Sequence, residues 1–425
     1  MPVPHRSWRR PALHVAVALA VLLAGLPFAA PAHAAAGDRW SLAGQDPVTT
    51  AVALSRFAFP DGAPSALLAR ADAFPDALAS GLLQDEGPLL LTAGAALDTA
   101  AREELARLGV ERVTVLGGTA AITEAVAEEL RQAGYRVSRL SGGTRVDTAV
   151  AVASSRPASR TVLLARAFGG SGDASQGFAD ALSAGAWAAA SGYPVLLSET
   201  ASLSAATAAY LRAAAVRTVI MVGGAAALSA QVEQQLLALG VGVRRVSGAE
   251  RAATAVAVAE AQGWDSSADV SQVVVVPGRG DSAWAAGFGA AALAAGGATA
   301  VVLAEGDALP TATRRFLRAG SADVVCAPLL ARARCDEAAE ELGTSSPELA
   351  AFAGTGAADQ ERGADGERSY TVTVDGGGPV TLALVDARAS AAGAPGWALD
   401  DDGDGAADLA SGPVITGVGG RAVTG

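Results

Sequence analysis

Short, continuous apolar runs alternate with longer stretches rich in Ala and Val over most of the chain. Equivalent runs that each begin such a group lie at 66–69, 161–165 and 273–276. Continuous apolar strands that alternate with helical segments indicate a parallel sheet with both faces covered. Right-handed crossovers then predict a small α/β sandwich for each group of strands, and three such units for the chain.

A short signature introduces each unit and shows that the three units are tandem repeats. Copies of this signature occupy 42–52, 140–150 and 246–256. Each copy has a glycine followed by a Thr-Ala pair at the start of a helical pattern. Arg145 and Arg251 lie before that pair in the second and third copies, where the first copy has Pro47. The predicted repeats span 37–137, 138–244 and 245–345.

Two further motifs distinguish the first two repeats from the third. A Phe-x-Asp-Ala-Leu loop that opens a helical pattern begins at Phe74 and at Phe178. The third repeat has Trp284 at this position and lacks the aspartate. The last strand of each of the first two repeats runs into Gly-Gly, whereas the third repeat has Ala327-Pro328. The third repeat is therefore a degenerate copy.

Residues 1–34 have the pattern of a secretory signal peptide. Arginines precede an apolar run at 15–28, and the sequence 32–34 supplies an A-x-A cleavage site. The alternative is an uncleaved membrane anchor, but the run is short for a membrane span. A second apolar stretch, 283–303, consists mostly of Ala and Gly, and we expect it to form a buried helix and strand. We therefore predict an exported protein without a stable membrane span after signal cleavage.

The composition excludes several functional classes. All three histidines, His5, His14 and His33, lie in the predicted signal peptide, and the chain has no lysine. The rest of the chain therefore cannot build a Ser-His-Asp triad, a histidine-ligated zinc site, a Walker lysine or a lysine Schiff base. The formal charge of −12 argues against a general nucleic-acid binder.

The three motifs together resemble the type 2 cell-wall-binding repeat of Gram-positive surface proteins. The resemblance covers roughly residues 40–340. It implies a pseudo-threefold body of three repeats that binds anionic wall polysaccharide or teichoic-acid-like polymer noncovalently. It also implies an S-layer-like surface protein whose repeats are not catalytic. Two alternatives stay open: a wall hydrolase that uses a pair of carboxylates, and a calcium-dependent adhesin.

Charged residues at the motifs and strand ends are the candidate polymer-binding residues. Arg145 and Arg251 lie at helix starts, where a cation opposes the helix dipole, so each either bridges to a motif aspartate or binds an anion. The motif aspartates either favour the helix starts that they occupy or hold a sugar hydroxyl. Two further arginines end equivalent strands, at the rim where open α/β sheets bind ligands. The candidates are Arg70, Arg145, Arg166, Arg251, Asp76 and Asp180.

Small motif residues have expected structural roles. The signature glycines allow a turn that a side chain would block. The signature threonines either satisfy free N–H groups at a helix start or pack under the loop. The Gly-Gly pairs form either a tight turn or a phosphate cradle, and their spacing is not that of a dinucleotide site. These residues are Gly44, Gly142, Gly248, Thr50, Thr148, Thr254, Gly117, Gly118, Gly223 and Gly224.

The two cysteines and the last part of the chain complete the sequence predictions. Cys326 and Cys335 form either a short-range disulfide or two free thiols. We interpret 346–368 as a linker and 369–425 as a β-rich region, an incomplete domain, with a hairpin formed by 370–377 and 380–385. An acidic turn in this region matches the start of a calcium loop but lacks its final glutamate. This turn, which is either a weak Ca²⁺ site or a solvated acidic turn, contains Asp400, Asp402, Asp404 and Asp408.

Overall fold

The computed structural model describes most of the chain between the predicted signal peptide and residue 343. The described residues are 39–170, 173–306, 308–318, 320 and 322–343, together with the backbone of strands 349–351, 361–362, 368–374, 378–384 and 397–400. The predicted signal peptide and its cleavage site lie outside these residues.

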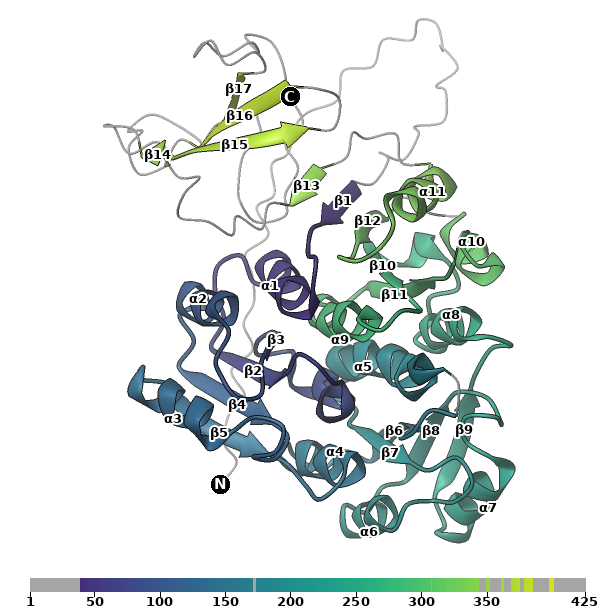
Figure 1. The fold of residues 1–425 in the computed structure, drawn as a ribbon. Helices are drawn as coiled ribbons and strands as arrows, with labels where there is room; N and C mark the ends of the chain where they lie inside the picture. Colours follow the sequence, from purple (N-terminus) through teal and green to yellow (C-terminus); the bar gives the residue numbers. More distant parts are fainter. Residues whose placement is uncertain are drawn as a thin grey trace, which may run out of the picture. The chain divides into compact units, whose positions relative to one another are not determined.

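Three parallel sheets form the α/β part of the protein, as the apolar runs predicted (Figure 1). The first has the order β3-β2-β4-β5 and comprises β2 (Ser65–Arg70), β3 (Leu89–Thr92), β4 (Arg112–Leu116) and β5 (Arg136–Leu140). The second has the order β7-β6-β8-β9 and comprises β6 (Thr161–Arg166), β7 (Val195–Ser198), β8 (Thr218–Val222) and β9 (Gly242–Val246). The third has the order β11-β10-β12-β1-β13 and comprises β1 (Arg39–Leu42), β10 (Gln272–Pro277), β11 (Thr299–Ala304), β12 (Asp323–Cys326) and β13 (Leu349–Ala351). We call these sheets, with their helices, modules 1, 2 and 3.

Each signature starts a helix, and local capping explains where two of these helices begin. The side chains of Asp46 and Thr144 each accept a hydrogen bond from the backbone N–H three residues on, and both form capping boxes. The signature helices are α1 (Pro47–Ala58), α4 (Arg145–Ser154) and α8 (Arg251–Ala261). The outer helices are α2 (Thr99–Leu108), α3 (Glu124–Gln132), α6 (Ala205–Ala213), α7 (Ala230–Ala238), α10 (Thr311–Leu317) and α11 (Arg332–Leu342).

The segment after the aromatic motif differs between the modules. Modules 2 and 3 form α5 (Ala179–Ser191) and α9 (Ala283–Ala294), whereas module 1 forms the two short 3₁₀ helices η1 (Pro75–Ala77) and η2 (Ser80–Leu83). The stretch from Asp76 to Leu89 is shorter than the equivalent stretch from Asp180 to Val195. A 3₁₀ helix rises about 2.0 Å per residue against about 1.5 Å in an α-helix, so the shorter stretch can span a comparable distance. Short 3₁₀ helices also precede α5 and β10, as η3 (Ala174–Gly177) and η4 (Ser267–Asp269).

Alternate residues of each central strand point into two different cores. In β2, Ala66 and Leu68 face a core that belongs to module 1 alone, whereas Leu67 and Ala69 face a core shared by all three modules. The same alternation occurs in the central strands of modules 2 and 3. Successive strand side chains point to opposite faces, so a continuous apolar run supplies both cores at once. The shared core is what makes one body of three modules.

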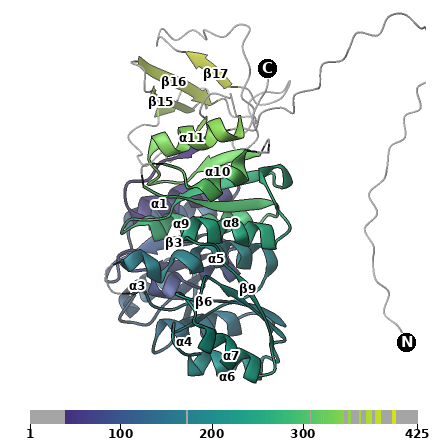
Figure 2. The same cartoon turned by 90° about the vertical axis from the view of Figure 1, so that its right-hand side faces the viewer.

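Small residues let the central elements approach closely in this shared core. A Cβ built on Gly81 would lie 2.2 Å from the carbonyl oxygen of Gly185, and one on Gly287 would lie 2.0 Å from Leu182. The helices α5 and α9 accordingly pack side by side between the sheets (Figures 1 and 2). This close packing is consistent with an apolar content dominated by Ala, Val and Leu and with only 4% aromatic residues. The apolar stretch 283–303 forms the buried helix α9 and most of the buried strand β11, as predicted.

The strand that closes the third sheet comes from the beginning of the body. β1 pairs in parallel with β12, just as β5 pairs with β4 and β9 with β8. The modules are therefore shifted relative to the sequence repeats. The boundary between 137 and 138 falls inside β5, and β1, which we assigned to the first repeat, completes module 3. The chain thus forms a closed ring of three modules.

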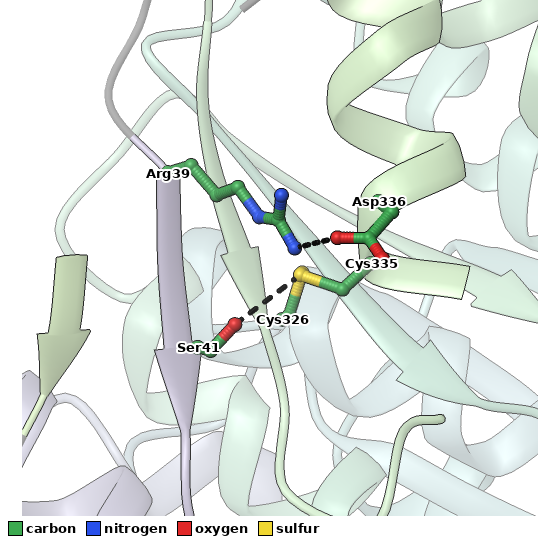
Figure 3. The surroundings of a disulfide bond; sticks show 5 residues. All are labelled: Arg39, Ser41, Cys326, Cys335 and Asp336. Carbon is green, nitrogen blue, oxygen red and sulfur yellow. Dashed lines mark hydrogen bonds and ion pairs between the residues drawn. A yellow bond between two sulfur atoms is a disulfide. The ribbon is translucent and has the colours of Figure 1, made fainter. Parts of the chain in front are cut away.

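A disulfide lies beside the closing strand (Figure 3). Cys326 at the end of β12 is bonded to Cys335 in α11, and Ser41 Oγ of β1 lies 3.4 Å from Cys335 Sγ. Arg39 of the same strand forms an ion pair with Asp336. On its other edge β1 pairs with β13, so the segment 346–368 is not simply a linker.

A separate four-stranded antiparallel sheet follows in the chain, and its hairpin confirms that part of the sequence interpretation. Strand β15 pairs with β16 in this hairpin, flanked by the shorter strands β14 and β17. The four strands are β14 (Glu361–Arg362), β15 (Arg368–Val374), β16 (Gly378–Leu384) and β17 (Trp397–Asp400). Asp400 ends β17, whereas the other three predicted calcium ligands lie outside the described residues. In the described part of the chain, no helix has both the length and the apolar character needed to cross a membrane.

Replacing both cysteines with serine should lower the stability of module 3. The disulfide closes a short loop with a sequence separation of 9, for which chain-entropy arguments give a stabilisation of roughly 2–3 kcal/mol. We expect a lower melting temperature by circular dichroism and no further change on adding dithiothreitol. The wild-type chain is the matched control, because reductant should lower its melting temperature toward that of the double variant. Equal melting temperatures with and without reductant in the wild type would contradict this role.

Candidate functional site

The signature glycines are needed where the loop folds back on the first turn of the following helix. A Cβ on Gly142 would lie 2.1 Å from the Cβ of Asp147, and one on Gly248 would lie 2.3 Å from that of Ala253. Gly44 similarly approaches the backbone of Thr50. The lack of a side chain at each signature glycine therefore lets the loop lie against the helix in all three signatures.

The signature threonine bonds this loop and, at one junction, the preceding module. Thr148 Oγ1 accepts a hydrogen bond from Gly142 N at 3.2 Å and donates one to Asp76 Oδ1 at 2.9 Å. Thr254 Oγ1 accepts the equivalent bond from Gly248 N at 3.0 Å. The signature of one repeat therefore meets the aspartate loop of the repeat before it.

The Gly-Gly pairs make room for the motif aspartates. Gly117 has φ +98° and Gly223 has φ +111°, values that L side chains rarely adopt. A Cβ at Gly117 would lie 2.4 Å from Asp76 Oδ2, and one at Gly223 would lie 2.5 Å from Asp180 Oδ2. The second glycines, Gly118 and Gly224, have open space at their Cβ positions. This close approach gives the first glycine of each pair a structural role at the turn.

The junction between module 3 and the first signature, which we call the third junction, has lost these polar contacts. Ala286 occupies the position of the motif aspartate, so no carboxylate is available to the threonine of the first signature. The hydroxyl of Thr50 is buried and has no hydrogen-bond partner among the residues that the structure describes. The degeneracy seen in the sequence thus affects the junction that closes the ring.

Asp180 is the more buried of the two motif aspartates. Burial raises its pKa to about 6, although the nearby cations Arg166 and Arg251 act in the opposite direction. A carboxyl in an apolar environment holds its proton because the charged form loses its hydration.

Arg145 is a half-buried cation that forms no ion pair with a carboxylate among the described residues. Its guanidinium carbon lies 5.5 Å from the ring centre of Phe74 and 4.7 Å from that of Phe168, and Nη1 donates to the Ala167 carbonyl at 2.9 Å. Burial lowers the pKa of this side chain while the charge of Asp76 raises it. Arginine nevertheless stays charged in proteins, so this is a fixed positive site.

Arg166 and Phe168 extend this positive site to the surface. Arg166 Nε donates to the Phe168 carbonyl at 2.9 Å, and the Phe168 side chain is one of the large apolar groups left exposed, at 42%. Within the described residues, neither Arg145 nor Arg166 forms an ion pair. We call Arg145, Arg166 and Phe168 the arginine–phenylalanine patch.

The other two candidate arginines are neutralised within the protein. The side chain of Arg251 is only 9% exposed. Its Nη2 lies 3.1 Å from Asp173 Oδ2, and its Nε lies 3.9 Å from Glu305 Oε1. Arg70 forms a two-pronged ion pair with Asp72 at 2.5 Å. Neither Arg145 nor Arg251 forms the expected bridge to Asp76 or Asp180 among the described contacts. Asp173 lies in the loop before α5, far from Arg251 along the chain, so no local pattern predicts this pair.

The three aromatic residues that begin the equivalent motifs meet at one place. The ring centre of Phe74 lies 5.2 Å from that of Phe178 and 6.4 Å from that of Trp284. These residues line a pocket of about 250 Å³ to which Arg145 also contributes. We call it the axial pocket, because each module supplies one equivalent aromatic residue. The sequence predictions missed these residues as a site, although their recurrence in all three motifs was a usable signal.

Comparison with known families identifies the first two repeats. Residues 41–127 and 139–233 each match the model of cell wall binding domain 2 (CWB2). The chain contains domains of the CWB2 family. The description of this family is that of a cell-wall-binding domain. The matched residues lie in the two repeats that keep all three motifs.

Similar proteins include two solved structures and one curated relative. Cwp6 from Clostridium difficile superposes with a TM-score of 0.65 at 20% identity, covering 72% of this chain and 48% of that one. Cwp8 from the same organism gives a TM-score of 0.63 at 24% identity, covering 73% and 52%. The N-acetylmuramoyl-L-alanine amidase LytC of Bacillus subtilis (strain 168) is 36% identical over 91 residues.

These matches cover only part of each similar protein. The chain spans about half of the two structures and, in the aligned region, 18% of LytC. At this level of identity the two structures show a shared fold. In the described part of the chain, no group of three or more His, Cys, Asp or Glu side chains is placed to hold a metal ion.

Replacing Asp180 with asparagine should remove part of the pH dependence of stability. The pKa of this group is about 6 in the folded protein and about 3.9 in an unfolded chain. Between these values the folded carboxyl keeps a proton that the unfolded one has lost, so stability falls as the pH rises through this window. The loss is roughly 3 kcal/mol by proton linkage.

The test compares denaturant unfolding of Asp180→Asn and wild type at pH 4 and pH 7, followed by circular dichroism. We expect the variant to gain stability relative to wild type by roughly 2 kcal/mol between the two pH values, because the unfolded carboxyl is already half ionised at pH 4. An unchanged difference between the two proteins at both pH values would show that Asp180 titrates normally.

Proposed function

We propose that this chain is exported and attaches to the cell wall by noncovalent binding of an anionic wall polymer at the arginine–phenylalanine patch. The CWB2 family supports the coarser statement that it binds the wall. The nature of the polymer follows from the chemistry of the patch.

The observation that carries this proposal is the pair of arginines without carboxylates. Arg145 and Arg166 both bond to backbone carbonyls next to Phe168 and form no ion pair within the described residues. Most other arginines described here are paired with Asp or Glu, including Arg70 and Arg251. A charge-assisted hydrogen bond to phosphate or carboxylate would use the free donors of the two unpaired arginines.

The exposed ring of Phe168 adds an apolar surface between these cations. Such a surface suits a sugar-containing polymer, which presents both anionic groups and apolar ring faces. The net negative charge of the chain does not oppose this, because screening limits the reach of distant surface charges to about 8–10 Å at physiological salt.

We further propose that the repeats do not catalyse a reaction. The motif aspartates, which could have served as a catalytic pair, have structural surroundings. Asp76 accepts a hydrogen bond from Thr148, and both Asp76 and Asp180 fit against a motif glycine. The amidase activity in the name of LytC belongs to that protein, and a wall hydrolase is not favoured here. A calcium-dependent role for the acidic turn stays a prediction.

Replacing Arg145 and Arg166 with methionine should release the mature chain from purified cell walls. Methionine keeps an apolar stem against the phenylalanine rings and removes the charge. Each lost charge-assisted hydrogen bond is worth about 1.5–3 kcal/mol, so we expect at least roughly tenfold weaker binding in a sedimentation assay.

Arg136→Met is the matched control, because Arg136 is exposed and already paired with Glu111. It should bind like the wild type, and binding of the wild type should weaken with increasing salt. The proposal is wrong if the wild type stays in the supernatant at low salt, or if the double variant binds as tightly as Arg136→Met.

A further inference from the structure

We propose that each chain bridges two strands of the anionic wall polymer, because module 2 has a second anion-binding surface at the other edge of its sheet. This inference rests on the proposed function for the first contact, which is made at the arginine–phenylalanine patch. The second surface consists of three exposed arginines, and we call it the amino-edge surface: Arg160, Arg212 and Arg217.

The sheet of module 2 brings these arginines to one edge. Arg160 directly precedes β6, and Arg217 directly precedes β8. The backbone N–H of Arg217 donates to the carbonyl of Arg160 at 2.8 Å, so the starts of the two strands lie side by side. Helix α6 connects the end of β7 to the start of β8, so Arg212 in its last turn lies at the same edge.

Acidic residues are missing from this edge. The chain segments that meet here contain no Asp or Glu: 154–162, 189–198, 208–222 and 236–246. Within the described residues, none of the three arginines forms an ion pair. Arg244 of the edge strand β9 is likewise exposed and forms no ion pair there, so it extends the positive surface. In a chain with a formal charge of −12, this edge is a local exception.

The repeat architecture does not require arginines at this edge. Glu111 of module 1 occupies the backbone position of Arg217, because its N–H donates to the carbonyl of the residue before β2. Glu111 pairs with Arg136. In module 3, Asp323 begins the equivalent strand β12. The dipole of α6 favours a cation in its last turn, which explains Arg212 but not the arginines that precede two strands.

The two positive surfaces of module 2 are too far apart for one anionic group. Arg160 precedes and Arg166 ends the strand β6, which has 6 residues. A strand rises about 3.3 Å per residue, which separates the Cα atoms of the two arginines by about 20 Å. The strands run parallel, so the arginine–phenylalanine patch and the amino-edge surface lie at opposite edges of the sheet. Two polymer strands can therefore bind one chain from opposite sides.

The amino-edge surface suits a linear polyanion. Arginine donors bind phosphate or carboxylate groups, and a row of cations binds a polyanion with release of its counterions. A membrane surface would require an apolar face beside the cations. Among the described residues, the exposed large apolar side chains are Phe168, at the other edge, and Leu237. We therefore infer a polymer as the ligand.

The bridging test mixes the mature chain with sonicated fragments of purified cell walls and follows light scattering. The wild type should aggregate the fragments. The triple variant Arg160→Gln/Arg212→Gln/Arg217→Gln should still sediment with walls through the arginine–phenylalanine patch, but should leave the scattering at the level of the fragments alone. A wild type that binds walls without aggregating the fragments would overturn the inference and leave the proposed function intact.

A matched control removes three exposed arginines that already have acidic partners. These are Arg112, Arg136 and Arg315, so the control variant has the same net charge as the triple variant. It should aggregate the fragments like the wild type. If the triple variant also aggregated them, bridging would come from another source, such as a dimer with two arginine–phenylalanine patches, and the inference would be wrong.

Titration with linear sodium polyphosphate tests the amino-edge surface without walls. The variant Arg145→Met/Arg166→Met should still bind polyphosphate. Adding the three Gln substitutions should weaken this binding roughly tenfold. It should also reduce the slope of log affinity against log salt by about 2, as expected for three lost contacts. Equal affinity with and without the three substitutions would overturn the surface.

Two further outcomes separate the alternatives. If the wild type is not retained on walls, the proposed function fails, and the polyphosphate titration alone decides whether the amino-edge surface binds polyanions. Vesicles of phosphatidylglycerol test the membrane alternative. If the three Gln substitutions abolish binding to these vesicles but leave polyphosphate binding unchanged, the partner is a membrane and the inference is wrong.

Discussion

Burial of the inner face of each sheet in the shared core is the constraint on which the rest of the structure depends. Each sheet is apolar on both faces, and its own outer helices cover only one of them. The other face must be covered by neighbouring modules, because exposing it would leave a large apolar surface in water. Three modules around small central residues satisfy this requirement together, so a single repeat cannot be regarded as an independent domain.

Closure of the ring follows from the same requirement. The third sheet takes its final strand from the beginning of the body, and an ion pair and a disulfide lie at this seam. Two of the three junctions between repeats keep the aspartate and its glycine, and the first also has the bond from threonine to aspartate. The third junction has lost the aspartate. The third junction is therefore stabilised by strand pairing, an ion pair and a disulfide, and not by the aspartate contacts of the other two junctions.

The three modules are equivalent in fold, but their candidate binding residues are not equivalent. Equivalent aromatic residues converge at one point and can make only one pocket. Equivalent arginines, in contrast, lie in different surroundings, and acids from other segments neutralise some of them. The second module keeps Arg145 and Arg166 unpaired within the described residues, and this local imbalance matters more for anion binding than the negative charge of the whole chain.

The sequence by itself predicted three strands of each parallel sheet, the repeated motifs, the antiparallel hairpin and the resemblance to the family, because continuous apolar runs and repeated motifs are local properties. It did not predict β1, β5 and β9, in which polar residues interrupt the apolar pattern. The tertiary structure decided which motif residues are free to bind. Arg145 and Arg251 occupy the same motif position, yet Arg251 meets Asp173 and Glu305 from distant segments, whereas the described contacts of Arg145 are with two aromatic rings and a carbonyl. The aromatic pocket and the closing role of β1 likewise arise from contacts between residues far apart in the chain. Spacing along a sequence cannot specify these contacts, because they depend on how three sheets pack around one core.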